Sequence, residues 1–164
     1  MQLFKNYSLE EKLAYLNGYL TNLAILNSGT NCGCDYFLAQ IEKKESVDET
    51  IQHEFKSFFD WLIENRKIKY QTDLKVYYEE VRGLDDALNN ELEIWLFGKE
   101  FPIQTHDTYQ KQVIKKNLIK MINHILEGDI QVWKVLDGSY DIEYFDLIIK
   151  DQNNYYYLHL GWCD

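Results

Sequence analysis

The sequence predicts an α+β fold in which a mainly helical N-terminal three quarters packs on a C-terminal three-stranded antiparallel β-meander. Two observations carry this prediction. Apolar residues recur at helical spacing over much of residues 1–128. After Gly128 the period changes to 2, and β-branched and aromatic residues dominate residues 129–164. The 164 residues match the usual length of one domain, so we expect residues 1–164 to share a single core.

Capping boxes predict where the first two helices begin. Ser8 is followed three residues later by Glu11, and Ser46 is followed by Glu49 in the same way. In each pair the serine caps the helix and the glutamate returns a hydrogen bond to the serine backbone. The apolar stripes behind these caps predict helices over about 9–27 and from about 47 to 65.

Further helical patterns follow after residue 70. One short helix is predicted from apolar side chains at 74, 77, 78 and 81, and another from those at 84, 88, 92 and 95. Thr105 or Asp107 is expected to cap a last helix that ends at Gly128. The short apolar segment 36–38 fits either a helix or a strand.

The strand register is predicted from the turns. Asp137-Gly138 is typical of a two-residue type I′ hairpin, which places Trp133 opposite Ile142. A four-residue turn over 151–154 places Asp146 opposite His159. The two turns disagree about which face of the middle strand points inward, and this predicts a β-bulge near Glu143 or Tyr144.

No pattern in the chain assembles a catalytic or metal site. Cys32-Gly33-Cys34 has a one-residue spacer, whereas structural zinc sites pair cysteines across two to four residues. The signatures of a serine hydrolase elbow, a phosphate-binding loop and a dinucleotide-binding loop are absent from the sequence. A cysteine nucleophile that meets one of the histidines in space stays an alternative: His53, His106, His124 or His159. We therefore expect no catalytic residue, no metal and no cofactor.

The formal net charge of −10 disfavours direct contact with nucleic acid or with an anionic membrane. A basic strip at 111, 115, 116 and 120 is expected to be one solvated face of the last helix. With no apolar run of membrane-spanning length and an odd cysteine count, the sequence predicts a cytoplasmic protein.

Residues 129–164 combine acidic and aromatic side chains. They hold seven acidic residues against two lysines, mixed with tryptophan and tyrosine. If one face of the meander packs on the helices, the other presents rings among carboxylates, which favours a cationic protein partner. The predicted partner-binding residues are Asp141, Glu143, Tyr144, Asp146, Tyr157 and His159.

The runs Tyr140-Asp141-Ile142-Glu143-Tyr144-Phe145-Asp146 and Tyr155 to Asp164 resemble the endings of bacterial immunity proteins from polymorphic-toxin and contact-dependent-inhibition systems. The resemblance covers roughly the last quarter of the chain. It implies a small acidic cytoplasmic antitoxin that occludes one cognate toxin domain, often a basic nuclease. The alternatives are a small cysteine-dependent enzyme and an acidic scaffold or regulatory module, and a homodimer stays open.

Overall fold

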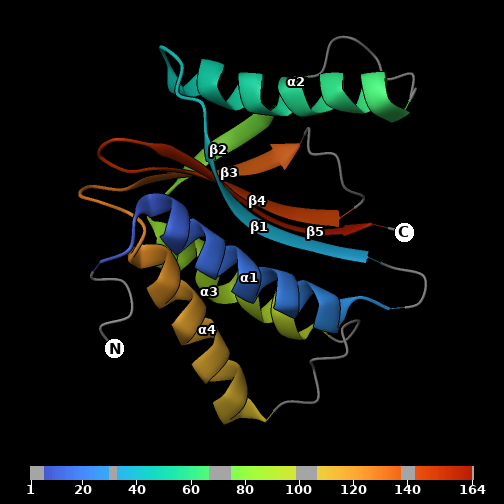
Figure 1. Cartoon of the computed structure of the whole chain (residues 1–164), viewed down its shortest axis with the longest axis vertical. Helices are drawn as coiled ribbons and strands as arrows, with labels where there is room; N and C mark the ends of the chain where they lie inside the picture. Colours follow the sequence, from blue (N-terminus) through green and yellow to red (C-terminus); the bar gives the residue numbers. More distant parts are fainter. Residues whose placement is uncertain (1–5, 30–32, 67–74, 99–106, 138–142, 164) are drawn as a thin grey trace.

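The computed structural model describes residues 6–29, 33–66, 75–98, 107–137 and 143–163. Over these residues a five-stranded antiparallel sheet, in the order β1-β5-β4-β3-β2, lies between two layers of helix. Helices α1, α3 and α4 cover one face, and α2 crosses the other (Figure 1). The helices are α1 (Leu9–Asn27), α2 (Val47–Arg66), α3 (Leu84–Phe97) and α4 (Thr108–Asn123). The strands are β1 (Gly33–Ile41), β2 (Tyr77–Val81), β3 (Gln131–Asp137), β4 (Glu143–Lys150) and β5 (Tyr155–Cys163).

The predicted helix starts are confirmed where capping side chains specify them. Ser8 and Glu11 form both hydrogen bonds of a capping box, at 3.2 and 2.7 Å. Ser46 and Glu49 do the same before α2. Asp107 accepts from the backbone N–H of Gln110 at 2.8 Å, so it is Asp107 that caps α4. Because these hydrogen bonds join residues only three positions apart, the sequence predicts where the helices begin.

The predicted architecture is wrong, because strands occur among the helices and the sheet has five strands. The undecided segment 36–38 belongs to β1, which pairs with β5. The segment predicted as a helix from residues 74–81 contains β2, which pairs with β3 along its whole length. The meander is therefore the middle of a larger sheet. Tertiary pairing outweighed the weak helical spacing of a five-residue edge strand.

The register between β4 and β5 is confirmed, and that between β3 and β4 is wrong. Asp146 lies opposite His159, as predicted. Trp133 lies opposite Ile148 instead of Ile142, and the predicted turn at Asp137-Gly138 lies partly outside the described residues. Pairing of β4 with β5 is continuous from Glu143 to Lys150, so the predicted bulge is absent there.

Both faces of the sheet are buried, which removes the conflict that predicted a bulge. Phe145 and Leu147 of β4 point into a core shared with α1, α3 and α4. Ile148 of the same strand packs with Trp133 and Tyr157 in a second core beneath α2. Alternate residues of β4 thus face two different cores, and neither face of the sheet has to be exposed to solvent.

Each edge strand receives a side-chain amide from a neighbouring helix. Asn17 of α1 donates to the carbonyl of Leu38 at 2.9 Å and accepts from its N–H at 2.8 Å. Gln52 of α2 makes the same pair with Val76, just before β2, at 2.9 and 3.0 Å. An amide that donates and accepts in this way imitates one pairing step of a missing strand.

Replacing Asn17 with alanine should lower the free energy of unfolding by about 1–3 kcal/mol, because both backbone groups of Leu38 lose their partner in a half-buried site. Urea denaturation measures the change. The control is Asn22→Ala on the same helix, whose amide makes only an exposed bond to the carbonyl of Gly18. Equal losses in the two variants would show that the edge contact contributes nothing specific.

A buried carboxylate organises the turn between β4 and β5. Asp151 accepts from the backbone N–H groups of Asn153 and Asn154 at 2.8 and 2.7 Å, and from that of Glu127 at 3.1 Å. The Tyr156 hydroxyl donates to the same carboxylate at 3.3 Å. Burial, followed by the charge of Asp151, raises the pKa of Tyr156 to about 12. The turn over 151–154, predicted from its sequence, is therefore held by one side chain.

Stability should fall as the pH rises from 10 to 12. An unfolded tyrosine loses its proton near 10, whereas Tyr156 keeps it to about 12 when folded, so the folded chain binds more protons in this window. Tyr156→Phe should make the decline shallower in denaturation experiments across that range. Tyr109→Phe, at a side chain that is 77% exposed, should leave the decline unchanged.

Candidate partner-binding site

The residues predicted to bind a partner are separated by the fold. Asp141 lies outside the described residues. Glu143 is exposed, and Tyr144 is half-buried with its hydroxyl donating to the carbonyl of Leu136 at 3.3 Å. The other three, Asp146, Tyr157 and His159, are buried in the face covered by α2. While α2 stays in place, a partner cannot reach Asp146 and His159, whereas the ring of Tyr157 forms part of the wall of a small cleft beside α2.

The three buried residues instead form a polar network inside the second core. Asp146 Oδ1 lies 2.6 Å from His159 Nδ1, and both side chains are fully buried. A carboxylate only accepts, so Nδ1 donates this bond. The Tyr157 hydroxyl lies 3.1 Å from the same nitrogen. The network is a buried structural unit, since its sheet face is closed by α2.

Next to this network, a small cleft opens between α2 and β1. Its volume is about 170 Å³. Two carboxylates and four aromatic rings line it: Asp35, Phe37, Glu54, Phe55, Phe58 and Tyr157. Asp35 is exposed on β1, and burial raises the pKa of Glu54 above its ordinary value, partly opposed by His53. We call this set of residues the α2–β1 cleft.

The outer part of α2 continues the aromatic character of the cleft. Trp61 is 49% exposed, and its ring centroid lies 6.0 Å from that of Phe58. Asp60 and Glu64 are exposed on the same half of the helix. Glu54, Phe58 and Trp61 follow a spacing of four and three residues, which places them on one stripe of α2. Aromatic rings among carboxylates, which we expected on the meander, therefore occur on this helix.

Sequence reasoning missed this surface because Phe55 and Phe58 were assigned to the apolar stripe of the helix and Trp61 was given no role. A signal was present: the helix has apolar side chains around more of its circumference than one buried stripe requires. Asp35 could not be placed beside α2 without the knowledge that residues 33–41 form an edge strand.

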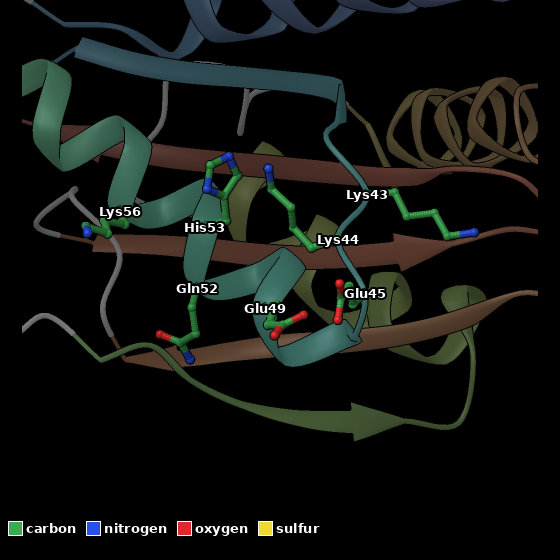
Figure 2. A pocket seen from close by; sticks show the side chains of 7 residues that line it. All are labelled: Lys43, Lys44, Glu45, Glu49, Gln52, His53 and Lys56. Carbon is green, nitrogen blue, oxygen red and sulfur yellow. The ribbon is translucent and has the colours of Figure 1, made fainter.

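A wider and shallower hollow, of about 790 Å³, lies at the first turns of α2 and the segment before it (Figure 2). Several of the side chains that line it already bind other groups of the protein. Gln52 binds the backbone of Val76, while Lys44 and His53 both pair with Glu42. Lys43 and Lys56 extend in opposite directions at its two ends (Figure 2). The basic groups of this hollow do not converge on one ligand position.

The predicted basic strip lies on α4, beside a groove of about 640 Å³ between α3 and α4. Lys115 pairs with Glu93 of α3 at 3.2 Å, and the Lys111 ammonium lies 5.5 Å from the centre of the Phe97 ring. Lys116 and Lys120 are exposed. Half of the strip is thus engaged in contacts that pack α4 against its surroundings, and the rest is solvated.

The residues of the cysteine-enzyme alternative are not brought together in the described part of the chain. Cys34 is half-buried in β1, and His124 is an exposed residue at the end of α4. Cys32 and His106 lie outside the described residues.

Among the residues that the structure does describe, no group of three or more histidine, cysteine, aspartate or glutamate side chains could hold a metal ion. None of the described helices combines the length and apolarity needed to cross a membrane.

Fold and site together define a helix-flanked, five-stranded antiparallel protein with a small acidic and aromatic cleft beside one edge strand. No family model matches the sequence, and no curated protein matches it. A crystal structure of citrus MAF1 has a similar fold, with a TM-score of 0.51 over 93% of this chain and 98% of that chain. The two sequences share 9% identity, so the likeness shows the fold alone.

Breaking the buried pair of Asp146 and His159 should destabilise the fold. Asp146→Ala leaves His159 without its carboxylate and should lower the free energy of unfolding by about 3–5 kcal/mol. His159→Ala should also destabilise, and the double variant should lose less than the two single losses together, as expected for coupled neighbours. Urea denaturation of the four proteins measures the coupling. Additive losses would contradict a direct interaction between the two side chains. The control is Glu79→Ala, at an exposed position of the edge strand β2, which should change the free energy of unfolding little.

Proposed function

We propose that this chain is a cytoplasmic immunity protein that binds a basic bacterial toxin domain, such as a nuclease, and blocks it by occlusion. The observation that carries the proposal is the acidic and aromatic surface on the second half of α2, next to the α2–β1 cleft. The net charge of −10 and the resemblance of the C-terminal quarter to immunity proteins support it.

The surface suits tight protein binding for physical reasons. Trp61 offers a large exposed ring, and tryptophan is one of the residues enriched among side chains that dominate interface energies. The carboxylates around it would attract a basic domain and speed encounter, because opposite charges steer association. A nuclease must be basic around its active site to hold phosphates, so an acidic protein that covers this site would inhibit without chemistry or a cofactor.

The structure changes which residues we assign to the interface. Asp146 and His159 are buried beneath α2, so they support the binding surface from below, and Tyr157 contributes only its ring to the wall of the α2–β1 cleft. Glu143 stays an exposed candidate at the start of β4. Trp61 and Glu64 replace the buried residues as the side chains that would touch the partner.

The test is coexpression with the product of the gene immediately upstream, followed by purification and measurement of affinity. The two proteins should copurify, and Trp61→Ala should weaken binding by roughly tenfold or more. Tyr109→Ala is the matched control, since Tyr109 is 77% exposed on α4, on the other side of the sheet. An upstream product that is not a toxin and does not bind would overturn the proposed function.

Charge reversal tests the electrostatic part separately. Glu64→Lys should slow association at low salt and matter less at high salt, because screening shortens the reach of exposed charges. Asp129→Lys makes the same change of charge at an exposed site between α4 and β3. If both variants slow association equally, net charge alone attracts the partner, and the carboxylates of the α2 surface have no specific role in association.

A further inference from the structure

The α2–β1 cleft has the composition of a cage for one organic cation. Four of its six lining side chains are aromatic, the other two are carboxylates, and no basic side chain lines it. Its volume of about 170 Å³ is several times the roughly 30 Å³ that one water molecule occupies in the liquid, which leaves room for the end of one side chain.

The cage is held in place before any ligand binds. The ring of Tyr157 contacts those of Phe37 and Phe55, with centroids 5.4 and 5.2 Å away. The hydroxyl of Tyr157 lies 3.1 Å from His159 Nδ1, which is anchored in turn on Asp146. A wall that is already ordered loses little conformational freedom when a ligand enters, and this favours binding.

The charge of the cleft is unbalanced in the described chain. Neither Asp35 nor Glu54 forms an ion pair or hydrogen bond with another described residue. Burial of Glu54 raises its pKa, so the cleft disfavours the charged form of this carboxyl when it is empty. A bound cation would stabilise that charged form.

Arginine fits this combination better than other cations. Its planar guanidinium group stacks on aromatic rings and offers five N–H donors to carboxylates. A lysine ammonium is more strongly hydrated and has no plane to stack. A metal ion would need ligands that the described residues do not supply.

We propose that the α2–β1 cleft binds the guanidinium group of one arginine side chain of the partner protein. Asp35 and Glu54 would accept its hydrogen bonds, and the rings of Phe37, Phe58 and Tyr157 would form the walls. This inference rests on the proposed function for the identity of the partner, but not for the chemistry of the cleft.

The cleft can be tested without the partner by titrating the protein with Nα-acetyl-arginine amide and following aromatic proton resonances by NMR. Resonances of the cage rings, Tyr157 and Phe58 included, should shift and saturate. The matched probe is Nα-acetyl-citrulline amide, which has the same shape without the charge and should bind at least about tenfold more weakly. Equal binding of the two probes, or no saturable shift with arginine, would overturn the inference.

Variants show whether the carboxylates are the acceptors. Glu54→Gln and Asp35→Asn keep the shape of each side chain and should each weaken the arginine probe by roughly tenfold, the loss of one charge-assisted contact. Asp60→Asn is the control on the same helix, outside the cleft. Unchanged binding in both cleft variants would overturn the assignment.

The two proposals fail in different experiments. If Trp61→Ala weakens the complex while the arginine probe does not bind, the immunity function stands and the cage is refuted. If the probe binds as expected but the upstream product does not, the cage stands and the proposed partner is wrong.

Discussion

The central constraint on this fold is that the sheet is buried on both faces. Five consecutive residues of β4, Phe145–Ile149, are buried, and their side chains alternate between two separate cores. A strand in this position cannot show the alternation of apolar and polar side chains that a half-exposed strand shows. Helix α2 imposes this condition by closing the face that α1, α3 and α4 leave open (Figure 1).

Closing that face forces polar side chains of β4 and β5 to find partners inside the protein. Asp146 and His159 are opposite each other in the register, and so they can pair without help from another element. Tyr157, two residues before His159 on the same face of β5, adds its hydroxyl to this pair and its ring to the wall of the α2–β1 cleft. The buried network and the surface cleft therefore share a side chain, which links stability of the core to the shape of the candidate site.

Local signals were enough to predict the features that depend on local hydrogen bonds. Both capping boxes, the cap at Asp107 and the turn organised by Asp151 lie within a few residues of the groups they bind. The pairing of Asp146 with His159 followed from the length of that turn. Strand β2 could not be predicted, because its five residues alternate poorly and gain their structure from β3, which is distant in sequence. The burial of Asp146, Tyr157 and His159 was missed for a related reason: the aromatic and acidic residues of β4 and β5 looked exposed only while the position of α2 was unknown.

The two amides on the edge strands also have a consequence for synthesis on the ribosome. Strand β1 emerges early but pairs with β5, the last strand to be made, and β2 similarly precedes its partner β3. Asn17 and Gln52 belong to helices that emerge before the backbone groups they bind, those of Leu38 and Val76. Each early strand can thus have one backbone position in or next to it occupied while its other edge waits for a partner strand. A nascent chain built in this order offers fewer open strand edges to its neighbours on the same polysome.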